Sequence, residues 1–444
     1  MMKRYILISI LFAAAVFGLS AQRVLTLDEC RELAIQNNVA IRNSSLTTLA
    51  AKEIRKQAFT KYFPNISVNA IAFTTDKGVL QHDFSGSLPL PAIPGITEGG
   101  ELDYNYDFSL IKKGIVAGAT LVQPVYMGGE IVNGNKLAEV GEAVAELQAR
   151  QSEDEVRQTV EQYYWQLAVL KAKRHTLDNV ITLLDTLSYQ VDVAVNAGVT
   201  LPNDLLEVQL RRNEMITDSI KLANGINIIS TLLAQYIGLG VEPVDITENI
   251  APEDSIALDG SIYLSPDDAL YSTVDYRLLT KGVKAAELNQ RMTLGANLPK
   301  VAIGAGYTES NLMSQWHGSA SLFATVTIPI TEWWGGSHAI KKSKLEVNVA
   351  KNNLEDASEL LKVKMKNSWN DLCTSYRKID VARMSIDQAT ENLRLNTIYY
   401  QAGTVTVTDL LKSQTLFRQS QDQYVEAAGQ YHIDVTKYLI ATGR

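Results

Sequence analysis

The chain reads AGVTLPNDLLEVQ over residues 197–209 and AGTVTVTDLLKSQ over residues 402–414, an offset of 205 residues. Ala, Gly, Asp, Leu, Leu and Gln all recur at that single offset. Recurrence in this order indicates an internal duplication, in which one structural unit occurs twice along the chain.

Each copy is predicted to form the tip of a helical hairpin. Gly198 and Gly403 follow long segments without proline. A glycine at this place ends a helix in the left-handed conformation, where a side chain would clash with the following carbonyl. The chain then turns and a shorter helix returns, to about residue 237 in the first copy and 440 in the second.

The returning helices begin with residues that suit a helix N-terminus. Pro202 fits the first helical position, and Thr406 forms a capping box with Asp409 three residues later. Asp204 and Asp409 fall in the first turn, where a carboxylate meets unpaired backbone N–H groups. Capping alone is therefore a sufficient explanation for both aspartates.

Length and charge limit the classes of protein that this chain can be. A chain of 444 residues would ordinarily hold two or three domains, but the duplication favours two repeats, 22–240 and 265–444, joined by a linker at 241–264. The formal charge is −8, with no run of Lys or Arg. This composition argues against nucleic acid as a partner.

Residues 1–21 are predicted to be a secretory signal peptide. Lys3 and Arg4 precede an apolar run that ends in small residues at Ala21. A retained membrane anchor is the alternative, which the short apolar run disfavours. No later apolar run reaches the ~20 residues of a membrane helix. If the mature chain spans a membrane, it must do so with strands.

Helices that end at a proline precede the predicted strands in both repeats. One helix is expected from a capping box at Thr26 towards Pro64, and its counterpart from Ser265 towards Pro299. Apolar and polar residues then alternate, the pattern of a strand with one apolar face. This pattern predicts β-hairpins at about residues 65–125 and 300–330, four strands in all.

The first hairpin is the longer one, and its excess is predicted to be irregular. Prolines and glycines between residues 89 and 100 indicate a loop. An alternating segment at 104–110 would extend the returning strand, and a shift of apolar register across 112–114 suggests a bulge. The segments 129–197 and 330–444 hold no proline, and the first has a heptad seam from Val156 to Val195, which predicts long coiled-coil helices.

Taken together, these segments resemble the TolC-like outer-membrane efflux protein family over nearly the whole mature chain. The resemblance rests on the order and duplication of short motifs: Leu25-Thr26-Leu27-Asp28-Glu29, Gln123-Pro124 with Gly128-Gly129, Ile328-Pro329 with Gly335-Gly336, and the two Ala-Gly…Asp-Leu-Leu…Gln tips.

The resemblance implies a mainly α-helical protein with membrane β-structure. It implies a homotrimer whose copies each give four strands to a shared outer-membrane β-barrel and their helices to a periplasmic α-barrel. It also implies an exit duct for a tripartite efflux or type I secretion system, with a periplasmic adaptor and an inner-membrane transporter as partners. Strand count supports the trimer independently, because four strands cannot close a barrel with a usable lumen.

Residue patterns for chemistry are weak throughout the chain. The five histidines are scattered, no zinc or metalloprotease spacing occurs, and nothing pairs a nucleophile with a base. We therefore expect no enzyme activity, no metal site and no cofactor. Cys30 and Cys373 are 343 residues apart, and the sequence leaves open whether they form a disulfide.

Aromatic residues at the strand ends are the first candidate site. Trp333 and Trp334 follow the last strand, and Tyr126 is their counterpart in the first repeat. Such residues form girdles where a barrel meets the membrane interface, here against outer-membrane lipid at the periplasmic rim. A sugar-stacking role for the two tryptophans is the alternative.

Charges at the tips are the second candidate site, at the periplasmic aperture between Gly198 and Gly403. Asp204, Glu207 and Asp409 would form acidic rings in a trimer and favour cations. Lys412 occupies the position equivalent to Glu207, so it could pair with an acid on an adjacent tip and hold the aperture closed. The alternatives are that the acids only cap helices and that the other side chains face solvent.

One other class of function fits part of the pattern. A periplasmic coiled-coil adaptor or scaffold that never enters the membrane would explain the helical hairpins. It would not explain four strands with apolar faces and aromatic ends. The transported substrate and the class of pump are not indicated by any residue pattern.

Overall fold

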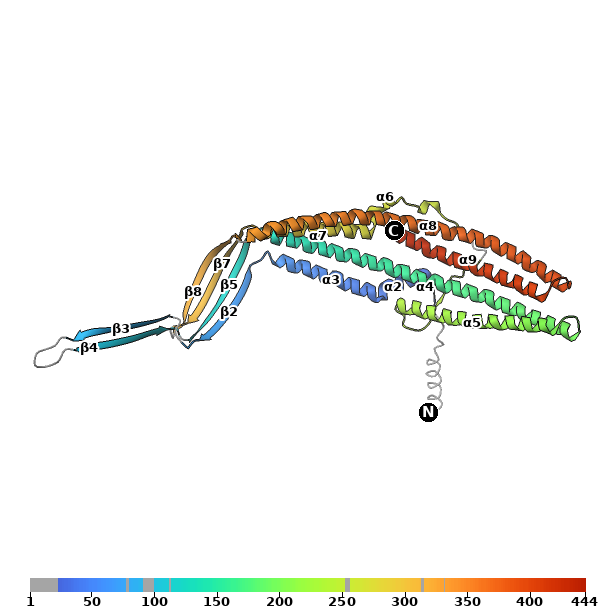
Figure 1. Cartoon of the computed structure of the whole chain (residues 1–444), viewed down its shortest axis with the longest axis horizontal. Coiled ribbons are helices and arrows are strands. Elements are labelled where there is room, and N and C mark those ends of the chain that lie inside the picture. The colour runs from blue at the N-terminus through green and yellow to red at the C-terminus, as the bar shows by residue number, and fades with distance from the viewer. Residues whose placement is uncertain are drawn as a thin grey trace, which may run out of the picture. The chain divides into compact units, whose positions relative to one another are not determined.

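The computed structural model describes residues 23–76, 80–90, 100–111, 113–251, 256–312, 315–330 and 332–444 (Figure 1). The predicted signal peptide lies outside these residues. Contacts within the chain divide it into two compact units. The first unit comprises residues up to 50, 143–282 and 351–444, and the second comprises 51–142 and 283–350. Each unit therefore takes segments from both halves of the sequence.

Helices account for most of the chain. The two longest, α4 and α8, contain 67 and 70 residues, as the proline-free segments predict. The principal helices are α2 (Leu27–Asn37), α3 (Val39–Thr60), α4 (Glu130–Asn196), α5 (Pro202–Tyr236), α7 (Val274–Ala296), α8 (Glu332–Gln401) and α9 (Val407–Ala441).

A hydrophobic core in the first unit holds the two hairpin tips together. The predicted seam of α4 supplies Leu177, Leu184 and Val191, each at most 1% exposed. They pack with side chains of α5 and α9, including Val208 and Leu411. The heptad spacing thus buries one face of α4 against both returning helices, as the seam predicts.

A second core in the same unit contains a buried ionic link. Glu161 of α4 is 2% exposed and accepts a 2.9 Å hydrogen bond from Nε of Arg31 in α2. Its other oxygen accepts the hydroxyl of Thr436 in α9. Because burying an unpaired carboxylate is costly, these contacts are what allow Glu161 to lie in this core.

The linker between the halves also enters this core. Strand β1 (Val24–Leu25) pairs in parallel with β6 (Asp245–Ile246). Nζ of Lys171 in α4 lies 2.6 Å from Oδ1 of Asp245. Leu25 and Ile246 are both buried, so the start of the described chain is fixed to its middle.

The four predicted strands form one antiparallel sheet in the second unit. Its order is β2-β5-β7-β8, with β2 (Asn65–Thr74), β5 (Lys113–Met127), β7 (Lys300–Asn311) and β8 (His317–Thr327). The two central strands, β5 and β7, come from different halves of the sequence, so the sheet joins the two hairpins.

The excess of the first hairpin contains a second sheet that the sequence analysis missed. Strands β3 (Leu80–Leu90) and β4 (Gly100–Leu110) pair with each other along eleven residues each. The expected loop was wrong at Pro89 and Gly100, which lie in strands, while its residues 91–99 lie outside the described residues; the expectation that 104–110 extends the returning strand was also wrong, because β4 pairs with β3. Pro89 fits because, among the described strands, β3 pairs on one side only, so no second ladder needs the missing N–H of Pro89.

Two predicted helices are interrupted. Asn38 breaks the first into α2 and α3: its backbone is extended, and its Oδ1 accepts the N–H of Ala40 at 2.8 Å. The helix expected from Ser265 lasts for only four residues, α6 (Pro266–Ala269), before a 3₁₀ turn. An extended Thr273 then starts α7, and its hydroxyl accepts the N–H of Tyr276.

Candidate functional site

One face of the four-stranded sheet is apolar across all four strands. The pairing places Ile66, Leu121, Ala305 and Leu322 in one row and Val68, Ala119, Tyr307 and Ala320 in the next. Val301 with Val326 and Ile303 with Ala324 extend this face towards the helices. Leu322 is 88% exposed and Val68 76%, so no part of the described chain covers the face.

The opposite face of the sheet carries mainly small and polar residues, with large apolar side chains at Ile71, Phe73, Val116, Val122 and Phe323. One row across it contains Ser67, Thr120, Gly306 and Ser321. Alternation along each strand separates the two faces, as in a sheet with an apolar environment on one side and water on the other. Polar residues occur on the apolar face near its ends: Gln123 at one end and Glu309, Asn311, Thr74 and Lys113 at the other.

Tyr126 lies on the apolar face because of a bulge. The β5–β7 register shifts between Pro124 and Tyr126, so Pro124 pairs with Ala302 and Tyr126 pairs with Val301. The bulge expected at 112–114 was placed wrongly: β5 pairs regularly with β2 from Lys113 onward. One extra residue re-aims the following side chain, which turns Tyr126 to the same side as Val301.

The two tryptophans lie in the first turn of α8 rather than on a strand. Trp333 donates its Nε1–H to the backbone carbonyl of Asn297 at 2.9 Å, which fixes the start of α8 beside the end of α7. Trp334 is 80% exposed and Trp333 47%. Their role at a membrane interface stays a prediction, as does that of Tyr126.

Close backbone approach explains the glycine at the end of β5. Gly128 has φ +62°, and a Cβ there would lie 2.1 Å from the carbonyl oxygen of Gly295. Only glycine tolerates both the left-handed conformation and this contact. Gly128 therefore permits the chain to pass from the sheet into α4 alongside the end of α7.

The two hairpin tips have the same backbone turn. Gly198 and Gly403 have φ +74° and +70°, as predicted. At each tip the glycine N–H donates to the carbonyl three residues earlier in the chain. The N–H of the residue after the glycine donates to the carbonyl five residues before its own position, and all these hydrogen bonds are 2.9 Å long. These paired bonds are the Schellman motif, which satisfies the last carbonyls of α4 and α8.

The helix starts after the tips differ. Thr406 and Asp409 form the predicted capping box, with the hydroxyl of Thr406 at 2.8 Å from the Asp409 carboxylate. Hydrogen bonds from the Thr406 hydroxyl and N–H lower the pKa of Asp409, and the charge of Lys412 lowers it further. In the first copy Leu201 caps α5 without a side-chain bond, and Asp204 instead accepts the Thr200 hydroxyl.

A polar contact joins the two tips within one chain. The hydroxyl of Thr408 in α9 donates to Oε2 of Glu207 in α5 at 3.0 Å. Lys412 is exposed, and no carboxylate among the described residues lies within ion-pair distance of it. The structure therefore brings Glu207 to the opposite tip but leaves Lys412 facing outward.

Tyr400 is a tip residue that the sequence analysis did not select. It packs against the core of the tips, and burial followed by the negative charge of Asp204 raises the pKa of its phenol. Its position three residues before Gly403 was the available signal, because the last turn of a helix lies beside its partner helix. Leu410 and Leu411 also belong to this core, whereas Leu206 is 61% exposed.

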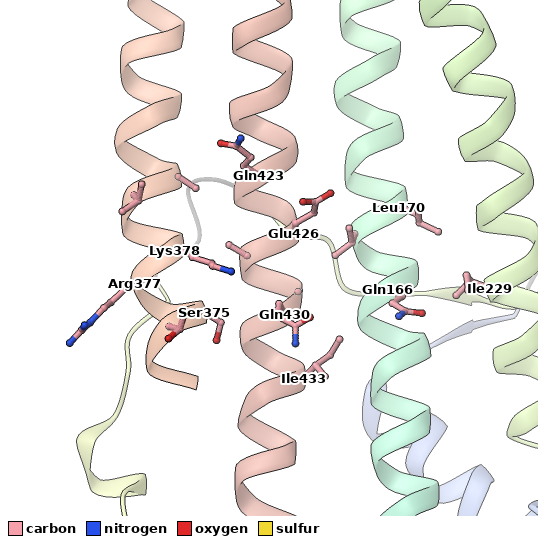
Figure 2. Close-up of a pocket in the computed structure, with 16 residues that line it drawn as sticks. Gln166, Leu170, Ile229, Ser375, Arg377, Lys378, Gln423, Glu426, Gln430 and Ile433 are labelled. Carbon is pink, nitrogen blue, oxygen red and sulfur yellow. The ribbon is translucent and has the colours of Figure 1, made fainter. Parts of the chain in front are cut away.

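A large groove lies between helices of the first unit. Its volume is about 930 Å³, and side chains of α4, α5, α8 and α9 line it (Figure 2). Lys378 of α8 points towards α9, and Glu426 of α9 forms an ion pair with Lys173 of α4. Apolar side chains such as Val169 and Ala427 line the groove as well, so it combines an apolar surface with polar groups.

The part of the chain that the structure describes contains no group of three His, Cys, Asp or Glu side chains placed to hold a metal ion. Nor is any of its helices both long and apolar enough to cross a membrane. Cys30 and Cys373 are both free thiols.

Comparisons with solved structures identify the fold. CusC, described with its transmembrane channel formation, aligns with a TM-score of 0.77 and 12% identity over 95% of this chain and 93% of its own. VceC, an outer-membrane protein of Vibrio cholerae, gives 0.74 and 13%, covering 94% and 96%. The open state of the MtrE outer-membrane channel of Neisseria gonorrhoeae gives 0.73 and 14%, covering 96% and 93%.

Sequence comparison relates the second half of the chain to one protein family. Residues 267–443 match the outer membrane efflux protein family, whose members are channels and not enzymes. No curated protein sequence matches the chain significantly. The second half of the chain therefore matches the outer membrane efflux protein family, and the described chain has the fold of solved outer-membrane channels.

Proposed function

We propose that this protein is the outer-membrane channel through which a tripartite efflux system exports its substrates. The observation that carries the proposal is the four-stranded sheet, which has one apolar face and no partner for either edge. Strands β2 and β8 each pair with one neighbour only in the described chain. Unpaired edges beside an exposed apolar face are unstable in water and in lipid.

Three copies of the chain would resolve both problems. Channels of this fold are trimers, and three sheets of four strands give a barrel of twelve strands. In such a barrel the edge of β2 pairs with β8 of the next copy, and every backbone group in lipid is satisfied. The apolar face then contacts outer-membrane lipid, and the row of Ser67, Thr120 and Ser321 faces the lumen.

Aromatic residues define the inner limit of the membrane zone in this proposal. Tyr126 lies on the apolar face beside Val301, at the end of the sheet from which α4 departs. Trp333 and Trp334 occupy the first turn of α8, directly after β8 and a short connection. Rings with a polar atom are favoured at the lipid headgroups, so all three suit the periplasmic interface.

The assembly is tested by fractionation and mass measurement. The protein should appear in outer-membrane fractions as a trimer that resists detergent and separates on heating. In planar bilayers the purified trimer should conduct ions. A soluble periplasmic monomer would refute the channel and favour the coiled-coil scaffold instead.

The adaptor partner has a suitable surface in the groove between the helices. An apolar floor rimmed by glutamines and charges is the kind of surface against which an amphipathic helix packs. Lys378 and Gln423 lie at this groove, so Lys378→Glu should weaken capture of the cognate adaptor from the same genomic region. Unchanged capture, with an intact trimer, would place the adaptor elsewhere.

The tips of a trimer would concentrate acidic groups around the aperture. Three copies each of Asp204, Glu207 and Asp409 would raise the local concentration of cations. The wild-type channel should therefore show a modest cation preference in reversal potentials across a salt gradient. Anion preference would contradict this reading and leave the aspartates as helix caps.

Lys412 is the proposed link between adjacent tips. The Lys412 side chain faces outward in one chain. Thr408 contacts only Oε2 of the Glu207 carboxylate, so the Glu207 carboxylate of a neighbouring tip can still accept a hydrogen bond from the Lys412 ammonium. An exposed pair of this kind contributes about 0–1 kcal/mol. Lys412→Glu should raise single-channel conductance, and adding Glu207→Lys should partly restore closure. Equal conductance of Lys412→Glu and wild-type trimers would exclude the link.

A further inference from the structure

The β3–β4 hairpin is an amphipathic two-stranded ribbon. Residues directly opposite each other in the register share a face, so Phe84 with Tyr106 and Leu88 with Leu102 lie on the same side. The other side carries Ser85 with Asn105 and Ser87 with Asp103. One face is therefore apolar and aromatic, and the other is polar and acidic.

Large side chains on the apolar face of the ribbon are more than half exposed in the part of the chain that the structure describes. Tyr106 is 73% exposed, and Phe84, Leu88 and Leu102 are each 56–57% exposed. Tyr104 lies flat across the ribbon, because a Cβ on the opposite Gly86 would come within 2.6 Å of its phenol oxygen. The face is thus a flat, contiguous surface suited to packing against a similar surface.

Such a ribbon does not stand alone in water. Within the described residues its strands pair only with each other, so both edges lack a partner there. An isolated two-stranded hairpin is marginally stable at best, and a third layer or a packed apolar face is needed to hold it. Something must therefore cover the apolar face in the assembled protein.

Charge decides which faces can meet. Glu101 and Asp103 lie on the polar face, and the two strands contain no Lys or Arg. Polar faces of two copies would repel each other, whereas apolar faces carry no charge that opposes contact. Copies of the ribbon can therefore associate only through the apolar side.

The root of the ribbon lies where neighbouring copies meet. Strand β3 starts six residues after β2 ends at Thr74, and β2 is the edge strand that the proposed barrel pairs with the next copy. The ribbon also leaves the end of β2 that is opposite to α3, which is the extracellular end of that barrel. Each copy thus brings one ribbon to the outer mouth, beside a subunit boundary.

We propose that the three ribbons of a trimer pack their apolar faces against one another and form a cap over the outer end of the channel. The partner of each ribbon is a second copy of the same chain, and the acidic faces point outward to solvent. This inference rests on the proposed trimeric channel. The cap restricts passage at the outer mouth, independently of the link proposed between the helical tips.

Cross-linking tests the cap on purified trimers. Leu102→Cys on the apolar face is compared with Asp103→Cys on the polar face. Both variants also carry Cys373→Ser to remove that free thiol, whereas Cys30 is retained because it is fully buried. Leu102→Cys should form disulfide-linked pairs of chains on mild oxidation, several-fold more than Asp103→Cys. It should also be protected from a charged maleimide that labels Asp103→Cys.

Each outcome bears on a different claim. If neither the variants nor the wild type can be isolated as a trimer, the channel itself is overturned. An intact trimer in which both cysteines are labelled and neither cross-links overturns the cap alone. Protection of Leu102→Cys on cells but not in the purified trimer would also overturn it, in favour of another surface protein as the occupant.

Conductance provides a second readout that does not depend on cysteines. Tyr106→Asp places a charge on the packed face, and Asn105→Asp adds the same charge to the solvent face. The first variant should increase single-channel conductance or the fraction of open time at least twofold, and the second should match wild type. Equal behaviour of the two variants in intact trimers would refute the cap.

Discussion

Replacing Leu322 with arginine tests which face of the sheet contacts lipid. Leu322 is 88% exposed in the single chain and lies in the row with Ile66, Leu121 and Ala305. That row is midway between Val301, beside Tyr126, and Glu309. If the apolar face contacts lipid, residue 322 lies near the middle of the membrane.

The expected cost follows from that depth. An arginine on the lipid face of a membrane barrel costs about 2–4 kcal/mol near the midplane. A homotrimer carries the change three times, so the total is roughly 6–12 kcal/mol. This is comparable with the whole stability of a typical protein, about 5–15 kcal/mol. Leu322→Arg should therefore abolish or severely reduce trimers in the outer membrane.

The matched control is the preceding residue. Ser321 lies on the opposite face, directly across from Gly306, which leaves space for a long side chain. Ser321→Arg should assemble normally, and its cations should reduce conductance and cation preference. The assay is the amount of heat-modifiable trimer in outer-membrane fractions, followed by single-channel recording of the variant that assembles.

The reasoning would be refuted by a reversed or equal result. If Leu322→Arg assembles and alters conductance while Ser321→Arg fails to assemble, the two faces have been assigned to the wrong environments. If both variants assemble equally well, the sheet does not contact lipid at all.

Three further outcomes are expected from purified protein. Hydrogen bonds that lower the pKa of Asp409 stabilise the fold above the unfolded-state pKa and are lost as pH falls through the folded-state pKa. Asp409→Asn should therefore lower Tm at pH 7 but approach wild type in acid, and a constant difference would contradict the capping role. Gly128→Ala should lower stability by more than the about 1–2 kcal/mol of left-handed strain, since the new Cβ would meet a carbonyl. At the control position, Gly129, the nearest atom to a new Cβ is 3.4 Å away, so alanine there should cost the strain only. Equal denaturation midpoints for the two variants would exclude the contact. Leu184→Ala should lower the free energy of unfolding by about 2–5 kcal/mol, because Leu184 is buried in the seam. Leu183 is exposed, so Leu183→Ala should change the free energy of unfolding by under about 1 kcal/mol. A small effect at both positions would place the seam elsewhere.

The hairpin tips were predictable because local chemistry decides them. Gly198 and Gly403 end helices where only a left-handed residue fits, and Thr406 with Asp409 satisfies the N-terminal amides. The sheet was predictable for a similar reason, since alternation along each strand marks its two faces. Pairing of Glu207 with Thr408 was not, because it depends on how two helices 200 residues apart meet.

The ribbon was missed because Pro89 and the prolines and glycines that follow it in the sequence resemble those of a loop. Pro89 argues against a central strand, and only the tertiary fact that β3 has one neighbour makes it acceptable. The bulge was misplaced for a related reason. A change of apolar register at 112–114 marks the passage from β4 in one sheet to β5 in another, and the sequence does not distinguish such a passage from a bulge.

The short parallel pairing of β1 with β6 constrains the order in which the chain can fold. Val24 pairs with Asp245, which follows it by 221 residues, so this contact has a very large loop to close. If the predicted signal peptide directs export with the amino end first, Val24 and Leu25 leave the translocation pore long before Ile246 does. The core around Leu25 must therefore form late, and until then the apolar amino-terminal segment is available to periplasmic chaperones.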